Sequence, residues 1–322
     1  MKKRGKAIMI GAAAAAVSLF AVTALASTPN TAGYDAFKEV LKANHAEGQA
    51  FESAAVTGSF SMAADGETVL SLSGAGKVRH GDDGHAMSGD FDLALEGFQR
   101  SGSLYSSGED AVYFVDRTHD LHYQVINLDR EHADHRKWER DGEFRGHGQP
   151  MGQAEEALLD FLVGDLKQEF AVANHADGSR TITVDVSQDE IPLPLRLLID
   201  AAAAEERGER TGPDPSAEAR LSQYPFFQGI EELRLEERLP ELKEGVAIER
   251  VQLRMTVDAS NRLQRVDGKL EVSGKDTAGA WHRITMEGAG EIGGLNATTP
   301  DAYDPGGKAV EIVDAASFGD RR

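Results

Sequence analysis

The stretch "VTGSFSMAADGETVLSLSGAGKV", residues 56–78, decides the fold class, because apolar and polar side chains alternate on both sides of an Asp-Gly pair. Alternate side chains of a β-strand point to opposite faces. This period of two therefore predicts two strands that are buried on one face only. Asp65-Gly66 is a preferred pair for a tight hairpin turn. The stretch predicts an antiparallel hairpin whose apolar face carries Val56, Phe60, Met62, Leu70, Leu72 and Val78.

The same alternation continues through much of the chain. A third strand is predicted around Phe91, Leu93 and Leu95, and the six strands together predict an antiparallel meander. The shorter strands of this meander are expected around 103–105, 112–115 and 123–126. Later strands are expected around 170–173, 181–186, 251–257, 266–272 and 284–292.

Glycines occupy several positions on the predicted apolar face, where a side chain would normally pack. Gly58, Gly74, Gly76 and Gly89 all have the parity of the apolar residues in their strands. Glycine weakens a strand interior, and its presence there often marks a bend or a close approach of another element. The pattern predicts strong curvature of the sheet or an element packed closely against it.

Apolar residues recur at helical spacing in three segments, which we expect to be helices. These are residues 34–45, 154–162 and 191–208. The predicted fold class is α+β: a strongly curved antiparallel sheet, an unclosed half-barrel, with two or three helices on its concave face. The βαβ alternation of doubly wound nucleotide-binding folds does not occur.

The first 26 residues differ in composition from the rest of the chain. Lys2, Lys3, Arg4 and Lys6 precede an apolar run that ends in Ala24-Leu25-Ala26. This is the pattern of an export signal cleaved at small residues, and a retained N-terminal anchor is the alternative. Either reading places the protein outside the cell or in the cell envelope.

The remaining sequence predicts one structural domain. A linker is expected at 27–33, a single β-rich domain at 34–297, a mobile loop near 208–225, and a C-terminal coil tail at 298–322. The loop contains three prolines among polar residues, which is typical of irregular structure.

Composition excludes several classes of function. The chain has no cysteine, so it has no disulfides, no thiol nucleophile and no cysteine-ligated metal. Its net charge of -20 argues against nucleic acid as a partner, because phosphate groups would be repelled. There is no GxSxG, no P-loop and no GxGxxG after a strand. We therefore expect a protein that is not an enzyme and has no cofactor.

The segment "DREHADHRKWERDGEFRGHG", residues 129–148, has two interpretations. His132, His135 and His147, with the acidic residues between them, form a candidate set of metal ligands. The charged residues and glycines around them also fit a solvated linker between a strand and a helix. We favour the linker, because the spacing of the histidines does not match that of a helical HExxH site.

A bent sheet under helices can enclose an apolar cavity. The candidate wall consists of Phe60, Met62, Leu70, Leu72, Phe91, Leu93, Leu253 and Met255. The same residues can instead fill an ordinary core. Two hypotheses follow. One is a carrier or sensor of an apolar ligand, and the other is a module that docks onto another envelope protein and binds no small ligand.

Four stretches of the chain carry a resemblance to known proteins. They are "TPNTAGYDAFKEVLKANH", "AEEALLDFLVGDLKQ", "TITVDVSQDEIPLPLRLLI" and "KLEVSGKDTAGAWHRITMEGAGEIGGLNATTPD". Together they resemble an uncharacterised group of exported or membrane-tethered proteins of spore-forming Gram-positive bacteria. The order of elements is similar to that of LolA/LolB-like lipoprotein carriers, which implies binding of a lipid, an acyl chain or a lipoprotein, or sensing of envelope components. The chain departs from the lipoproteins of that family in having no cysteine for lipid attachment.

Overall fold

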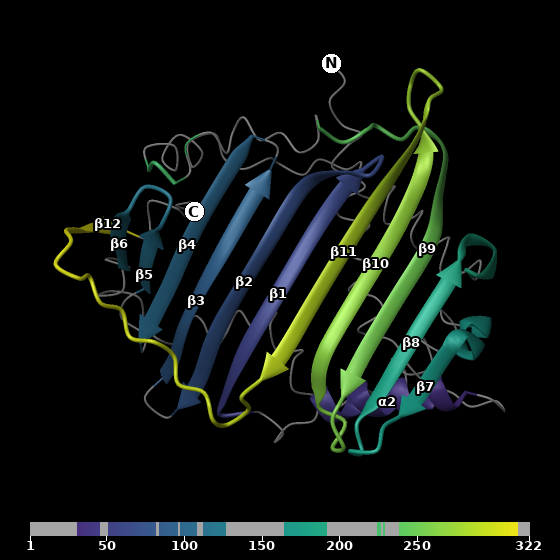
Figure 1. The fold of residues 1–322 in the computed structure, drawn as a ribbon, viewed down its shortest axis with the longest axis horizontal. Helices are drawn as coiled ribbons and strands as arrows, with labels where there is room; N and C mark the ends of the chain where they lie inside the picture. Colours follow the sequence, from purple (N-terminus) through teal and green to yellow (C-terminus); the bar gives the residue numbers. More distant parts are fainter. Residues whose placement is uncertain are drawn as a thin grey trace, which may run out of the picture.

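A computed structural model describes residues 31–45, 51–81, 84–95, 97–107, 112–126, 164–191, 224–226, 228 and 238–314. In this part of the chain, twelve strands form one large sheet that does not close on itself (Figure 1). One α-helix, α2 (Ala32–His45), accompanies it, together with two 3₁₀-helices, η2 (Gly164–Glu169) and η3 (Gln188–Glu190). The prediction of an unclosed sheet made mostly of antiparallel strands is confirmed.

The strand bounds match the predicted alternating segments, and most strands are longer than predicted. The first six are β1 (Ser53–Ala64), β2 (Glu67–Gly81), β3 (Gly84–Leu95), β4 (Phe98–Ser107), β5 (Val112–Asp116) and β6 (Leu121–Ile126). The others are β7 (Phe170–Asn174), β8 (Arg180–Ser187), β9 (Glu244–Val257), β10 (Leu263–Lys275), β11 (Trp281–Gly293) and β12 (Val310–Asp314).

The strand order is β12-β6-β5-β4-β3-β2-β1-β11-β10-β9-β8-β7. Strands β1 to β6 form the predicted meander, and β9 to β11 form a second one. The two meanders are joined by antiparallel pairing of β1 with β11, in which Met62 lies opposite Met286. All strand pairs are antiparallel except β12 with β6, which is parallel.

The C-terminal segment corrects one prediction. Residues 298–322 were expected to be coil, but residues 310–314 form strand β12 at an edge of the sheet. A strand of five residues shows little alternation of its own, and its pairing partner is almost two hundred residues earlier in the sequence. Between β11 and β12 the chain passes along the ends of the strands of the first meander (Figure 1).

The register separates the sheet into an apolar face and a polar face. One row of paired positions crosses seven strands and contains only apolar side chains. It consists of Leu95, Leu70, Met62, Met286, Leu270, Val251 and Val186. The neighbouring row on the opposite face includes Ser61, Ser71 and Glu287, as the alternation predicts.

Helix α2 covers the apolar face near β7 and β8. The ring centroids of Tyr34 and Phe37 each lie 5.1 Å from that of Phe170 on β7. Gly33, in the first turn, permits this close packing, since a Cβ there would lie 2.1 Å from the carbonyl oxygen of Phe170. Tyr34, Phe37, Met62, Ile182 and Ile284 are almost fully buried and belong to the same core.

The number of helices also differs from the prediction. Two or three helices were expected on the sheet, whereas the described residues contain one α-helix, which is the one predicted at 34–45. The predicted helices at 154–162 and 191–208 lie outside the described residues, apart from Ile191. Gly164, shortly after the second predicted helix, begins η2. No helix in the described part of the chain is both long and apolar enough to cross a bilayer.

Two of the four glycines on the predicted apolar face, Gly74 and Gly89, have little room for a side chain, and the atoms that limit the space belong to the paired strand. A Cβ on Gly74 would lie 2.9 Å from the carbonyl oxygen of Asp90, and one on Gly89 would lie 3.0 Å from that of Ala75. On β4, a Cβ on Gly102 would lie 2.6 Å from the ring of Phe91 and 2.9 Å from that of Phe114. Aromatic rings therefore pack directly over Gly102.

Candidate ligand-binding site

An apolar hollow of about 340 Å³ lies on the apolar face near the β12 edge of the sheet. All of its lining side chains are aliphatic or aromatic. They are Phe91, Leu104, Phe114, Tyr123, Val125, Tyr224, Phe226 and Val313. Five strands of the sheet contribute side chains, and a short segment far away in the sequence contributes Tyr224 and Phe226.

Strand register brings the wall of this hollow together. Leu104 pairs with Phe114, and Phe114 pairs with Tyr123, so these three side chains form one row on the apolar face. Val125 and Val313 pair across the parallel β6 and β12 strands and extend the wall to the edge. Tyr123 and Val313 are 4% and 3% exposed. The wall is thus built on sheet positions rather than on loops.

The ring of Phe226 packs on this row from outside the sheet. Its centroid lies 4.8 Å from that of Phe114 and 5.9 Å from that of Phe91, both edge to face. Tyr224 makes a similar edge-to-face contact with Tyr123 at 5.7 Å. Such geometry is favourable for aromatic pairs and contributes about 0.5–1.5 kcal/mol each beyond area burial. These contacts hold residues 224–226 against the sheet.

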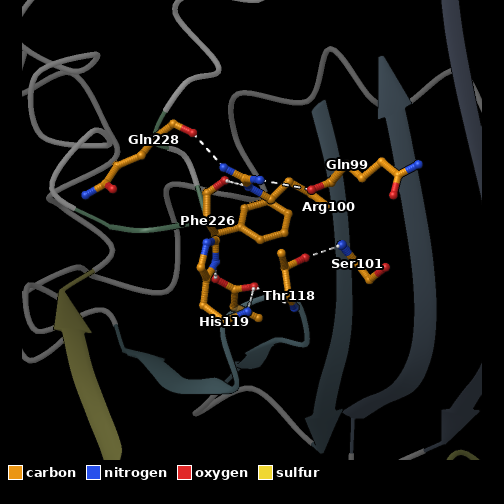
Figure 2. A network of polar contacts seen from close by, with 8 residues as sticks. Gln99, Arg100, Ser101, Thr118, His119, Phe226 and Gln228 are labelled. Carbon is orange, nitrogen blue, oxygen red and sulfur yellow. Dashed lines mark hydrogen bonds and ion pairs between the residues drawn. The ribbon is translucent and has the colours of Figure 1, made fainter. Parts of the chain in front are cut away.

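Arg100 on β4 fixes the backbone of the same segment (Figure 2). Its Nε donates to the carbonyl oxygen of Phe226 at 2.9 Å, and its Nη2 donates to that of Gln228 at 2.8 Å. Nη1 donates to the carbonyl oxygen of Gln99 at 2.9 Å. The guanidinium also lies 4.0 Å from the centroid of the Phe98 ring. Arg100 therefore joins the sheet to the residue whose ring lines the hollow.

The turn after β5 closes this end of the sheet. Asp116 is fully buried, and its carboxylate accepts hydrogen bonds from the backbone N–H groups of Thr118 and His119 at 3.0 and 3.1 Å. The Nδ1 of His119 lies 2.7 Å from the other oxygen of Asp116. The Thr118 hydroxyl accepts a hydrogen bond from the backbone N–H of Ser101 (Figure 2). These bonds set the geometry of a turn. Among the described residues, no serine or threonine hydroxyl contacts the His119 ring, so the His119–Asp116 pair does not form a catalytic triad there.

The two tyrosines of the hollow keep their protons under ordinary conditions. Burial, followed by the charges of Glu311 and Asp116, raises the pKa of Tyr123 to about 12. Burial and Glu311 also raise the pKa of Tyr224. Because the phenols are neutral at physiological pH, the wall carries no charge.

The structure places all eight predicted wall residues on the apolar face, but at different depths and positions. Phe91 lines the hollow described above. Met62 and Met255 are buried in the core, and Phe60, Leu70 and Leu253 pack against that core. Leu93 is half-buried, and Leu72 is 42% exposed.

Most of the hollow was not identified from the sequence. Leu104, Phe114, Tyr123 and Val125 lie in strands that were predicted, and their alternation was the available signal. Tyr224 lies at the end of the loop predicted at 208–225, Phe226 follows directly after it, and Val313 lies in the predicted coil tail. No local pattern indicated that these last three residues meet on one face.

The segment with the candidate metal ligands His132, His135 and His147, for which a solvated linker was the favoured interpretation, lies outside the described residues. Within the part of the chain that the structure describes, no group of three or more His, Asp or Glu side chains is arranged to hold a metal ion. His122 Nδ1 lies 2.9 Å from the Tyr303 hydroxyl. That histidine helps to hold the C-terminal segment on the polar face.

Two polar hollows are present elsewhere. One, of about 600 Å³, lies over the polar face and includes Arg254, Lys269 and Glu287. The other, of about 770 Å³, includes Asp65, Trp281 and His282. Their charged side chains already make ion pairs, such as Lys269 with Glu287 at 3.0 Å and His282 with Asp65 at 2.7 Å. The apolar hollow is therefore the stronger candidate site.

Comparisons with known proteins add no functional information. No protein-family model matches the sequence, and no curated protein matches it. Among solved structures, "Crystal structure of MucB in complex with MucA(peri)" aligns with 84% of this chain and 99% of that chain, at 8% identity and a TM-score of 0.10. A TM-score this low carries no argument about fold or function.

Proposed function

We propose that this protein binds an apolar ligand, such as an acyl chain, in the hollow between β3–β6, β12 and residues 224–226. The observation that carries the proposal is the wall itself, which is formed by eight side chains that are all aliphatic or aromatic. Water in such a hollow lacks hydrogen-bond partners, so an apolar group displaces it favourably. Binding sites for apolar ligands are concave and lined in this way.

The size of the hollow fits a single hydrocarbon chain. A volume of about 340 Å³ accommodates on the order of ten water-sized groups, since each occupies about 30 Å³. A methylene group is of similar size. A bulky multi-ring or multi-chain lipid would need a larger space, so the proposal is for one acyl chain.

The proposed setting is the cell envelope. The basic and apolar composition of residues 1–26 supports export, and the resemblance to LolA/LolB-like carriers supports a half-barrel that holds a lipid. In this setting the protein would act as a carrier or sensor of an acyl ligand and not as an enzyme. Lipid, lipoprotein or another envelope protein would be its partner.

Two neighbouring residues of β12 provide a matched test. Val313 lines the hollow and is almost fully buried, whereas Ile312 points to the opposite face and is 63% exposed. We expect Val313→Trp to fill the hollow and weaken binding of the neutral fluorescent probe N-phenyl-1-naphthylamine by about tenfold or more, which corresponds to about 1.4 kcal/mol. Ile312→Trp should leave the affinity unchanged. Fluorescence titration of the full chain measures both.

Thermal unfolding of each variant serves as the control for folding, because overpacking a buried site costs about 1–3 kcal/mol. Equal probe affinity in the wild type and in a folded Val313→Trp variant would reject this hollow as the site. A wild-type protein that binds no apolar probe would reject the proposed function and leave the hypothesis of a protein-docking module.

A further inference from the structure

Arg100 is unusual for its position on the sheet. In the described strands β1 to β6, it is the only lysine or arginine whose side chain belongs to the apolar face, where it pairs with Leu93. The next position of that face on β4 is Gly102, over which the rings of Phe91 and Phe114 pack. A permanent positive charge thus lies beside an uncharged hollow.

No carboxylate of the described residues forms an ion pair with Arg100. Its three hydrogen-bond acceptors in the described residues are the neutral carbonyl oxygens of Gln99, Phe226 and Gln228. A guanidinium has five N–H donors, so two of them have no acceptor among the residues that the structure describes. Other arginines of the sheet differ: Arg117, Arg250 and Arg265 each lie within ion-pair distance of an aspartate.

Two acidic residues of the neighbouring strands have register positions on the apolar face: Glu311 on β12, which pairs with Tyr123, and Asp116 on β5, which pairs with Gly102. Asp116 does not neutralise Arg100. Its carboxylate is fully buried and accepts from Thr118 N–H, His119 N–H and the His119 ring. These three contacts hold it within its own turn. It forms no ion pair with Arg100 in the described part of the chain.

From this arrangement we infer that the natural ligand is an anionic single-chain amphiphile, a fatty acid whose alkyl chain enters the hollow while its carboxylate binds Arg100. The inference rests on the proposed function and specifies its ligand class. A guanidinium binds carboxylates more strongly than it binds neutral carbonyls, because both partners are charged. The hollow supplies affinity for the chain, and Arg100 supplies selection for the acid.

The test compares two ligands that differ only in the head group, dodecanoate and dodecanol, by displacement of N-phenyl-1-naphthylamine from the full chain at pH 8. A hydrogen bond to a charged group contributes about 1.5–3 kcal/mol, so we expect dodecanoate to bind about tenfold or more tightly than dodecanol. Arg100→Met should abolish this preference. Arg117→Met, which removes a guanidinium paired with Asp92 on the polar face, should keep it.

The outcomes separate this inference from the proposed function. Equal affinity of the wild type for acid and alcohol would overturn the inference but not the apolar site, and binding of neither would overturn both. Because Arg100 also holds residues 226 and 228, Arg100→Met could lose binding of both ligands by disturbing the wall. In that case Arg100→Lys decides: a retained preference for dodecanoate supports the inference, and a lost preference with dodecanol still bound rejects it.

Discussion

Arg100 and Gly102 lie two positions apart on the same face of β4. Replacing either of them with a residue typical of strands would disturb a specific contact. At Gly102, an added methyl group would lie within 3 Å of two aromatic rings. Glycine within a strand destabilises it by roughly 0.5–1 kcal/mol relative to alanine, and the rings that pack over Gly102 offset this loss. At Arg100, the long side chain reaches the carbonyl groups of a segment more than one hundred residues later.

His282 illustrates a second local arrangement, at the start of β11 beside two hairpin turns. Its Nδ1 lies 2.7 Å from Asp65, at the β1–β2 turn, and its Nε2 lies 3.3 Å from Asp276, at the β10–β11 turn. Hydrogen bonding to Asp65, and to a smaller extent to Asp276, raises the pKa of His282. The same contact lowers the pKa of Asp65. One histidine thus joins two hairpin turns.

This bridge has a defined dependence on pH. Because the pKa of His282 is raised in the folded state, its stabilisation is full below the ordinary value of 6.5 and is lost as pH rises through the folded value. The pKa of Asp65 is lowered, so its contribution is present above 3.8 and is lost as pH falls through the folded value. We expect NMR titration to give a pKa for His282 above 6.5.

Substitution of Asp65 and of Asp276 in turn checks which of the two aspartates raises the pKa of His282 more. Asp65→Asn should lower the pKa of His282 more than Asp276→Asn does, because Asp65 makes the dominant contact. An unchanged titration of His282 in Asp65→Asn would show that the bridge is absent in solution. His175, whose Nε2 lies 2.8 Å from the Thr181 hydroxyl and which contacts neither Asp65 nor Asp276 in the described residues, is an internal control in the same spectra.

The strands of the first meander are tied together by the segment between β11 and β12. On the polar face, Asp301 accepts from Lys77 at 2.8 Å and from Ser88, and Tyr303 stacks on Tyr113 with centroids 4.1 Å apart. The rings are nearly parallel, with an angle of 11° between them. This segment carries the chain to β12, whose Val313 lines the hollow. Packing on the polar face thus positions a wall residue on the apolar face.

A double-mutant cycle measures this coupling. Tyr113→Ala and Tyr303→Ala should each lower the free energy of unfolding, and the interaction energy from the double variant should be about 0.5–1.5 kcal/mol, the value for aromatic pairs. Chemical denaturation of the four proteins gives the cycle. Additive effects of the two substitutions would indicate that the C-terminal segment does not pack on β5 in solution.

The elements differ in how well the sequence predicts them. Segments such as 56–78 and 251–257 alternate over many residues, so their strands and buried faces were predictable from the period alone. Helix α2 was predictable from the spacing of Tyr34, Phe37, Val40 and Leu41. Strand β12 was not, because five residues carry little pattern and its stability depends on pairing with β6.

The whole sheet depends on pairings that the pattern does not encode. Alternation shows which side chains share a face, but it does not show that β1 pairs with β11 or that β12 pairs with β6. The hollow arises from those pairings, since its wall combines β3–β6 with Val313 and the distant Phe226. For the same reason Phe91 was the only member of the predicted cavity wall that lies in it. The sequence pattern indicated which residues share a face, but not which strands pair, and the strand pairing is what the prediction of the hollow lacked.

Isotope-filtered NMR of the full chain with dodecanol tests the binding site most directly. If the apolar hollow is the site, NOEs should connect the ligand methylenes with Phe114, Val125 and Phe226, and none should reach Met62 in the core. NOEs confined to another part of the sheet, or their absence at a concentration that saturates probe displacement, would contradict it.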